Sequence, residues 1–333
     1  MVTELTPTKR AAIWPTYVCP MKCSFCYEKF REVKEHRSFE DVRKEMDTYL
    51  AKGINFFDCS GGEPTLYPHI TDFIKYALSK NAKTCLITSA IAGENTVKTI
   101  LESGVADFLV SIHGLRDTHN KVVGVPNARD LQIRFMKQVM DKMRFRMNCV
   151  ITKNNQDEIV ELAKWMVQFK PYIVNFINFQ PLRDWKDHSE DASKVIADLR
   201  VLEPNLNEAI KILEDNGCGV NVRYYPMCRI AEQYRRCVCS DFAVPFDPYE
   251  WIYDMDPNDL KGCIAWGKKT SIMNEEKGEP CCRCDLQWIC GGVNKSVNQI
   301  TNQAMVDPIV NTGIVNKQDF YYYRRNNVLT LKV

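Results

Sequence analysis

The chain has 333 residues, of which 45% are hydrophobic and 26% charged, and 44 Lys and Arg residues against 42 Asp and Glu residues leave a net charge of +2. This length can bury one large core or two smaller ones, and the charge balance gives no electrostatic reason to expect a nucleic-acid partner. No run of 18 apolar residues is present and the first ten residues lack the apolar middle of a signal peptide, so we expect no membrane partner and a cytoplasmic location.

Strand-like and helix-like segments alternate through the first 180 residues. The patterns predict strands at 11–18, 54–59, 83–88, 106–112, 145–151 and 172–179, with helices at 39–52, 70–80, 96–103, 129–143 and 157–169. Strict alternation predicts an α/β fold with a parallel sheet and right-handed crossovers. A closed eightfold barrel needs about 250 residues, so we predict a partial (β/α)6 TIM-like barrel. A doubly wound open sheet is the alternative, because periodicity does not distinguish the two.

The pattern changes in the last third of the chain. One more helix is predicted at 194–215 and one more strand at 219–225, and from residue 226 the strong periodicity disappears while prolines and cysteines gather. We therefore predict two domains, a barrel at 11–225 and a small, loop-rich, metal-organised domain with a C-terminal tail at 226–333.

Fifteen cysteines stand out in a chain with no sign of secretion, and their odd number excludes complete disulfide pairing. Most of them are clustered, at positions 19, 23 and 26, at 228, 237 and 239, and at 281, 282, 284 and 290. Clustered cysteines indicate metal binding. The scattered ones are interpreted as small core residues: Cys59, Cys85, Cys149, Cys218 and Cys263.

The first cluster has a spacing that suits iron better than zinc. Thiolates of Cys19, Cys23 and Cys26 can reach three irons of one [4Fe–4S] cube from a single loop and leave the fourth iron open, whereas zinc prefers pairs of Cys-x-x-Cys. With Phe25 before the last cysteine, the motif resembles that of the radical S-adenosylmethionine (radical SAM) enzymes. The resemblance implies that S-adenosylmethionine binds the open iron and that one electron cleaves it to methionine and a 5′-deoxyadenosyl radical, which abstracts hydrogen.

A second stretch, Ser60-Gly-Gly-Glu-Pro64, follows the second predicted strand, where the family has its GGEP-like motif. The resemblance implies that Gly61 and Gly62 let the backbone approach the methionine amino group. Glu63, before Pro64, would hold the chain or accept from that ammonium group. Later positions match the family less specifically. They are the further candidate contacts to S-adenosylmethionine: Ser89, Ser111, Arg134, Asn148 and Val150.

His113 follows the fourth predicted strand directly after Ser111-Ile112 and is a candidate acid or base. A hydrogen-bonded structural histidine is the alternative. For Arg134, the alternative is an exposed helical arginine. Ser89 stands in Thr88-Ser89-Ala90, where relatives often have Thr-Asn-Gly.

The last cluster is Cys281-x-x-Cys284, followed by five residues and Cys290-Gly-Gly292. It resembles the core of SPASM and twitch auxiliary-cluster domains. The full SPASM pattern has a further cysteine where Asn294 stands here, so the resemblance implies one auxiliary [4Fe–4S] cluster. Cys228 is the candidate for the fourth ligand, a structural zinc site is the alternative, and the competing cysteines are Cys237, Cys239, Cys263 and Cys282.

The sequence thus predicts a radical SAM enzyme that abstracts hydrogen from a small sugar- or nucleoside-like biosynthetic intermediate. Dehydrogenation, epimerisation, elimination and rearrangement all remain open as outcomes. The resemblance implies an electron donor such as flavodoxin or ferredoxin. A maturase of a ribosomally synthesised peptide is the alternative, and a non-catalytic iron–sulfur or zinc protein that binds nucleic acid is the hypothesis from a different class, disfavoured by the near-neutral charge.

Overall fold

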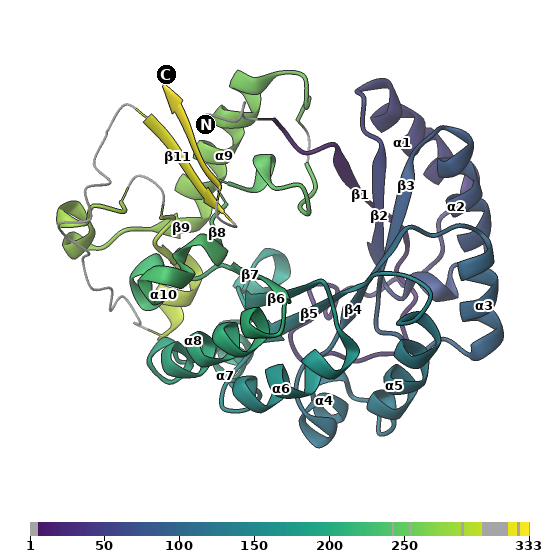
Figure 1. The fold of residues 1–333 in the computed structure, drawn as a ribbon, viewed down its shortest axis with the longest axis horizontal. Helices are drawn as coiled ribbons and strands as arrows, with labels where there is room; N and C mark the ends of the chain where they lie inside the picture. Colours follow the sequence, from purple (N-terminus) through teal and green to yellow (C-terminus); the bar gives the residue numbers. More distant parts are fainter. Residues whose placement is uncertain are drawn as a thin grey trace.

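The computed structural model describes residues 6–241, 243–252, 255–287, 290–301, 319–324 and 327–332. Its main sheet has eight strands that neighbour one another in chain order and run parallel (Figure 1). The strands are β1 (Arg10–Thr16), β2 (Phe56–Gly61), β3 (Lys83–Thr88), β4 (Asp107–Ser111), β5 (Arg146–Ile151), β6 (Ile173–Asn178), β7 (Gly219–Arg223) and β8 (Val238–Cys239). A doubly wound sheet reverses its strand order at a switch point, so the doubly wound alternative is wrong. Because β1 and β8 are the sheet's two edges, the described residues form an open, partial barrel, as predicted. Its eight strands exceed the six of the predicted (β/α)6 unit, because β7 and the short, unpredicted β8 extend the sheet.

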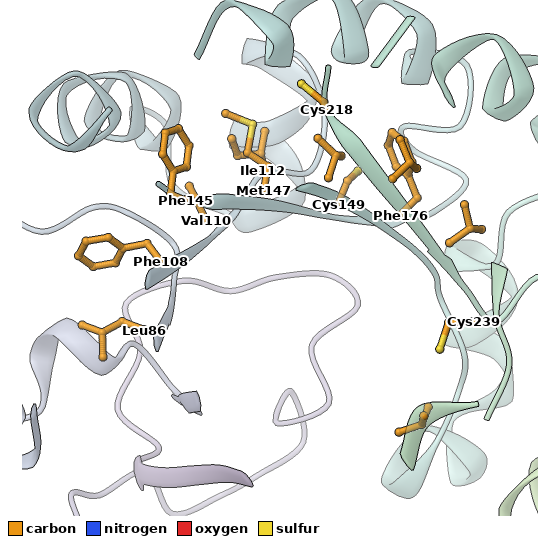
Figure 2. Close-up of a cluster of buried hydrophobic side chains, with 14 of the residues drawn as sticks. Leu86, Phe108, Val110, Ile112, Phe145, Met147, Cys149, Phe176, Cys218 and Cys239 are labelled. Atoms are coloured by element: carbon orange, nitrogen blue, oxygen red, sulfur yellow. The ribbon is translucent and has the colours of Figure 1, made fainter. Parts of the chain in front are cut away.

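Helices cover the convex face of this curved sheet (Figure 1). They are α1 (Phe39–Ala51), α2 (Ile70–Ser79), α3 (Glu94–Glu102), α4 (Arg116–Val123), α5 (Ala128–Val139), α6 (Ile159–Met166), α7 (Ser189–Val195) and α8 (Leu199–Asp215). Between sheet and helices, Phe108, Met147 and Phe176 are fully or almost fully buried in one apolar core (Figure 2). Side chains alternate along a strand, so the residues between these core positions face the concave side.

Short 3-10 turns connect or extend the main elements. They are η1 (Pro64–Leu66), η2 (Val167–Phe169), η3 (Arg183–Asp187), η4 (Met227–Arg229), η5 (Glu232–Cys237), η6 (Val244–Phe246) and η7 (Glu279–Arg283). Within the described residues, every helix is too short or too polar to cross a lipid bilayer.

The predicted strands and helices up to residue 179 are found, with ends that differ by a few residues. Two differences concern helices. α4 was not predicted, and the single helix predicted at 194–215 is wrong because α7 ends at Val195 and α8 begins at Leu199. Asp198 separates them, since its carboxylate accepts a hydrogen bond from the backbone N–H of Arg200 at 2.9 Å and caps α8.

The chain after residue 226 contains α9 (Leu260–Asn274), α10 (Lys295–Thr301), the antiparallel pair β9 (Glu275–Glu276) and β10 (Val293–Asn294), and the hairpin β11 (Asp319–Arg324) and β12 (Asn327–Lys332). β8 extends the barrel sheet, and Ile252 pairs with Ala11 of β1. The C-terminal part is thus packed against both edges of the barrel, and the division at residue 225 stays a prediction.

Paired charges fill the concave side near the beginnings of the strands. Arg10 contacts Asp58 at 2.6 Å, and Arg146 contacts Asp107 at 2.8 Å and Asp58 at 3.4 Å, all of them buried. Cys85, interpreted from the sequence as a core residue, lies in this network, because Arg146 Nη2 is 3.2 Å from its Sγ. Ligands of parallel α/β folds bind at the carboxyl ends of the strands, and the opposite end is closed here by ion pairs.

Candidate functional site

The loop between β1 and α1 carries Cys19, Cys23 and Cys26, and we call residues 17–37 the cysteine loop. Backbone N–H groups of Lys22 and Ser24 donate to the carbonyls of Val123 and Val122 at the end of α4, at 2.8 and 2.9 Å. The Phe25 ring packs edge-on against the His113 ring, with centroids 4.6 Å apart. These contacts hold the loop over the carboxyl ends of the strands.

The thiols of this loop are costly to ionise unless a cation is present. Burial raises the pKa of Cys19 to about 11, and the nearby Glu63 and Cys26 add to the effect. Burial also raises the pKa of Cys26 and that of Cys23, where the neighbouring Cys26 and Cys19 add repulsion. Cys19 and Cys23 pack against one apolar cluster, formed by Met21, Val122, Val123 and Ala128.

Gly61 and Gly62 are held against the start of the cysteine loop. Gly62 N donates to Thr16 O at 2.7 Å and Glu63 N donates to Val18 O at 2.8 Å. A Cβ at Gly61, where φ is +107°, would overlap the Thr16 carbonyl oxygen, and one at Gly62 would overlap that of Val18. The sequence argument assigned the missing Cβ atoms to the approach of a ligand, whereas the structure places protein backbone there.

Glu63 is 1% exposed and joins the end of β2 to the end of β3. Its Oε1 accepts from Thr65 Oγ1 at 2.7 Å and Thr88 Oγ1 at 2.6 Å, and its Oε2 accepts from the Ser89 N–H at 2.8 Å and from the Ser89 hydroxyl. Of the two roles predicted for Glu63, the structure shows the one that holds the chain. The carboxylate fixes the position of Ser89.

The structure does not bring Arg134 together with the other candidates, because its side chain is exposed on α5. A residue of the same helix that the sequence argument missed does reach the strand ends. Gln132 is fully buried, and its Nε2 donates to the carbonyls of Ser89 and Ser111, at 2.9 and 2.6 Å. A glutamine on an amphipathic helix is usually solvent-exposed, so nothing in the sequence indicated that Gln132 is buried and holds two strand ends.

His113 is buried and accepts a hydrogen bond at Nδ1 from the backbone N–H of Val150, at 3.1 Å. Burial lowers the pKa of His113 to about 3, so the ring is neutral near pH 7. Asn155, also missed from the sequence, donates from Nδ2 to the carbonyls of His113 and Val150, at 3.1 and 2.9 Å. This geometry favours the structural alternative for His113.

Ser111, Asn148 and Val150 share the concave face at the carboxyl ends of β4 and β5. Ser111 is in register with Asn148, and Val150 lies two residues further along β5. Val150 and Phe25 pack against one apolar cluster, formed by Phe179, Trp185, Ala192, Val195, Ile196, Val293 and Val297. Cys228 and Cys281 pack against the same cluster, which therefore connects the two cysteine groups.

Cys228 lines one pocket together with Cys281, Cys284 and Cys290, which stand more than fifty residues later in the sequence, and we call it the cysteine pocket. Its lining is Pro226, Met227, Cys228, Lys277, Cys281, Cys284, Leu286, Gln287, Cys290 and Gly292. Cys290 Sγ accepts from the backbone N–H groups of Met227 and Gly292, each at 3.4 Å, and burial raises the pKa of Cys290 to about 12. The four predicted auxiliary-cluster cysteines are thus brought together.

The competing cysteines are not among the residues that line the pocket. Cys282 is exposed and its Sγ lies 2.9 Å from Glu279 O, while Cys263 is fully buried with its Sγ 3.3 Å from Asp256 O. Cys237 and Cys239 are buried around β8. Asn294, at the position of the absent SPASM cysteine, donates from Nδ2 to Gln180 Oε1 at 3.0 Å and so ties β10 to the barrel.

Comparison with known proteins agrees with this arrangement. Residues 13–166 match the sequence model of the radical SAM superfamily. The chain contains a radical SAM domain. Radical SAM proteins use a [4Fe–4S] cluster and S-adenosylmethionine, and the matched residues include Cys19, Cys23, Cys26 and the Gly61–Pro64 motif.

Curated relatives of the chain have varied names. The S-adenosylmethionine-dependent nucleotide dehydratase of Flammeovirga pacifica is 27% identical over 222 residues, which are 62% of this chain and 72% of the relative. The protein of that name from Lacinutrix mariniflava is 24% identical, over 58% of this chain and 45% of the relative. Fe-coproporphyrin III synthase of Methanosarcina barkeri is 25% identical, over 45% of this chain and 39% of the relative. The chain spans less than half the length of the last two.

Solved structures resemble the chain over most of its length. Streptococcus suis SuiB bound to S-adenosylmethionine has a TM-score of 0.61 and 18% identity, covering 91% of this chain and 76% of that one. SuiB bound to the precursor peptide SuiA has a TM-score of 0.59 and 17% identity, covering 92% of this chain and 76% of that one. At these identities the likeness shows the fold, and it confirms the predicted partial barrel.

Proposed function

We propose that the chain is an enzyme that reductively cleaves S-adenosylmethionine and abstracts hydrogen from a small-molecule biosynthetic intermediate. A [4Fe–4S] cluster with S-adenosylmethionine supplies the electron and the radical precursor for such chemistry. The observation that carries the proposal is the cysteine loop, which contains Cys19, Cys23 and Cys26 and is held over the carboxyl ends of the strands.

The donor set fits a cube rather than a single ion. Among the described residues, no three His, Cys, Asp or Glu side chains converge closely enough to hold one metal ion. In a cube each thiolate binds a different iron, so the sulfurs must lie apart while facing a common space. We assign Cys19, Cys23 and Cys26 to the cluster that binds S-adenosylmethionine.

By the same argument we assign the cysteine pocket to one auxiliary [4Fe–4S] cluster, with Cys228, Cys281, Cys284 and Cys290 as ligands, in a SPASM/twitch-like domain. Four cysteines around one pocket, and two backbone N–H groups directed at Cys290 Sγ, support this assignment. A structural zinc site is the alternative.

S-adenosylmethionine is proposed to lie on the concave face between the cysteine loop and the strand ends. Its contacts are assigned to Phe25, Gly61, Gly62, Glu63, Pro64, Ser89, Ser111, Asn148 and Val150. Glu63 and Gln132 would act by positioning, because they hold the Ser89 and Ser111 segments in place. Arg134 is left out because it is exposed on α5.

A sugar- or nucleoside-like substrate is the preferred class. This preference is supported by the curated relatives, whose names, nucleotide dehydratase and GTP 3′,8-cyclase, state that they act on nucleotides. The alternative is a peptide maturase, favoured by the fold likeness to SuiB in complex with a precursor peptide. We propose flavodoxin or ferredoxin as electron donor and a cytoplasmic location, where fifteen free thiols stay reduced.

The test is anaerobic reconstitution with iron, sulfide, S-adenosylmethionine and dithionite, followed by assay of 5′-deoxyadenosine. Wild-type protein should release it, and Cys19→Ala, Cys23→Ala and Cys26→Ala should each abolish the release. The matched control Cys218→Ala replaces a buried cysteine outside both groups and should retain it. Release by all three loop variants, or no release by wild type, would contradict the proposal and favour a non-catalytic metal protein.

A further inference from the structure

Three asparagines form a row across neighbouring strands of the barrel. Asn148 of β5 is in register with Asn175 of β6, which is in register with Asn221 of β7. We call these three residues the asparagine row. Neighbouring strands are about 4.8 Å apart, so the row spans roughly 10 Å.

The row lies on the concave face of the sheet. The residues that alternate with it, Met147, Phe176 and Val222, belong to the apolar core beneath the helices, where Figure 2 shows the first two. Since side chains alternate along a strand, Asn148, Asn175 and Asn221 face the opposite way. Three amides therefore point into the barrel at one level.

These amides are buried with unused hydrogen-bonding capacity. Asn148 is 7% exposed, Asn175 6% and Asn221 1%, and the Oδ1 of each lacks a hydrogen-bond partner among the described residues. A buried polar atom without a partner costs free energy that replacement by an apolar group would avoid. Three such atoms in register indicate a surface that is completed by a ligand.

Glu250 fixes the orientation of one amide. Asn221 Nδ2 donates to Glu250 Oε1 at 3.3 Å, so the opposite orientation would bring two oxygens together. Asn221 therefore presents Oδ1 as an acceptor to the barrel interior. Arg223, two residues further along β7, is 6% exposed, and its Nε has no partner among the described residues, so it adds one donor beside the row.

The charges around the row are balanced. Arg146 is paired with Asp58 and Asp107, and Arg223 is paired with Glu250 at 2.9 Å and lies 3.6 Å from Asp241. The guanidinium groups next to the row are thus already neutralised, which disfavours a phosphate or carboxylate there. Unpaired amide oxygens instead suit a neutral group with several hydroxyl or amine donors.

The row also lies at a suitable depth in the barrel. Val150 is the next concave-facing residue of β5 after Asn148, and it packs in the cluster shared by Phe25, Cys228 and Cys281. The row is therefore one side-chain layer below the apolar cluster against which Phe25, Cys228 and Cys281 pack. Asn175 and Asn221 continue this layer away from the candidate contacts of S-adenosylmethionine on β4 and β5.

We propose that Asn175 and Asn221, with Arg223 Nε, bind the substrate, and that the bound part of the substrate is a neutral polyhydroxylated unit, a nucleoside or a sugar. This inference rests on the proposed function. A peptide substrate would present mostly backbone donors and acceptors in alternation and is treated as a competing outcome.

The test uses full-length, reconstituted protein and the variants Asn175→Leu and Asn221→Leu, with Asn207→Leu as matched control. Asn207, on α8, is a partly buried amide with both partners in place, since it accepts from Ala231 N and donates to Glu203 O, each at 2.8 Å. The probes are the four common ribonucleosides, N-acetylglucosamine, and a twelve-residue peptide of Gly, Ser and Lys. The two readouts are the probe-dependent increase in 5′-deoxyadenosine release and the melting temperature without probe.

We expect a ribonucleoside or N-acetylglucosamine to raise the release of 5′-deoxyadenosine, and whichever does so identifies the source of the polyhydroxylated unit. In Asn175→Leu and Asn221→Leu, the concentration of probe that gives half-maximal release should rise at least about 10-fold. Asn175→Leu should also raise the melting temperature, because its unpaired oxygen is removed, whereas Asn207→Leu should lower it and leave the response to the probe unchanged.

The inference would be overturned if only the peptide raised the release of 5′-deoxyadenosine, or if no probe did. It would also be overturned if Asn175→Leu and Asn221→Leu responded to the probe as wild type does. Loss of probe-free release in these variants would assign the row to S-adenosylmethionine instead. Failure of the wild type to release 5′-deoxyadenosine at all would instead contradict the proposed function, and the melting temperature of Asn175→Leu would still test whether this amide is unpaired.

Discussion

At the scale of single residues, Glu63 shows how a motif that looks like a ligand contact can act on the protein itself. Its carboxylate receives hydrogen bonds from Thr65, Thr88 and Ser89, so the ends of β2 and β3 form one unit. Gly62, next to it, allows this unit to lie against the backbone of Val18 at the start of the cysteine loop. The motif therefore connects the cysteine loop to the strand ends that surround the proposed site.

We predict that Glu63→Gln lowers the free energy of unfolding by about 2 kcal/mol, because the new amide would direct a donor at groups that also donate. Urea unfolding at pH 7 measures the change. Glu102→Gln is the control, since Glu102 is exposed and lies 3.9 Å from Lys98 Nζ, and it should change stability by less than about 0.5 kcal/mol. Equal stability of Glu63→Gln and wild type would contradict the role assigned to the carboxylate.

His119 provides a prediction for the dependence of stability on pH. It is fully buried, its Nδ1 accepts from the His113 N–H at 3.0 Å, and burial, with the nearby His113 and Arg129, lowers its pKa from 6.5 to about 2. In the unfolded chain the ring takes up a proton below about pH 6.5, whereas the folded protein keeps it neutral. The stability contribution of His119 is therefore complete above pH 6.5 and is lost as the pH falls.

A histidine that stays neutral in the folded protein should lower the free energy of unfolding by about 1.4 kcal/mol for each pH unit below pH 6.5. We expect His119→Asn, in which Oδ1 can replace Nδ1 as acceptor, to show a smaller loss between pH 6.5 and 5 than wild type, by about 2 kcal/mol. Urea unfolding of metal-free protein at both pH values measures it, with the exposed His69 replaced by Asn as control. A slope identical to that of wild type would show that His119 is protonated in the folded state.

At the scale of elements, the strands were predictable because nearly every strand of a parallel sheet is buried on its helix-covered face and reads as a short apolar run between polar turns. The break between α7 and α8 was not predicted. The apolar residues Val195, Ile196 and Ala197 continue the helical pattern across it, so hydrophobicity alone does not show where one helix ends. The available signal was Asp198, an N-cap residue before Leu199.

We predict that Asp198→Ala lowers the free energy of unfolding by about 1 kcal/mol, since the N–H of Arg200 loses its acceptor. Thermal or urea unfolding checks it. Asp215→Ala, at the other end of α8, is the control: its carboxylate pairs with Lys211 at the exposed surface, so its loss should have an effect below about 0.5 kcal/mol. An equal effect at both positions would indicate that Asp198 does not act as the cap.

At the scale of the whole molecule, spacing predicts which cysteines belong together only when they share a loop. Cys281, Cys284 and Cys290 could be grouped from the sequence, and so could Cys19, Cys23 and Cys26. Cys228 is more than fifty residues from its proposed partners, and only the fold, in which η4 (Met227–Arg229) follows β7, brings it to the cysteine pocket. For the same reason, the asparagine row, contributed by three strands, could not be read from the sequence, because register is a property of the sheet.

The cysteine pocket gives the last prediction. Two cubes predict about eight irons in the reconstituted protein and about four in a variant in which Cys19, Cys23 and Cys26 are all Ala. Adding Cys228→Ala to that variant should remove or destabilise the residual cluster, because one iron loses its thiolate. Adding Cys263→Ala should not, because this thiol is buried at α9 and does not line the pocket. Iron analysis and electron paramagnetic resonance of the reduced protein measure both.

The outcome also bears on the chemistry of the auxiliary site. With thiolates at all four irons, the cluster offers no free iron for a substrate and is suited to electron transfer or to orienting groups nearby. That would leave substrate recognition to the barrel, where the asparagine row lies one layer below the apolar cluster that connects both cysteine groups. An unchanged four-iron signal without Cys228 would instead mean that three thiolates hold the cluster or that another donor replaces Cys228, and an open iron at the cysteine pocket would then compete with the row as the place where substrate binds.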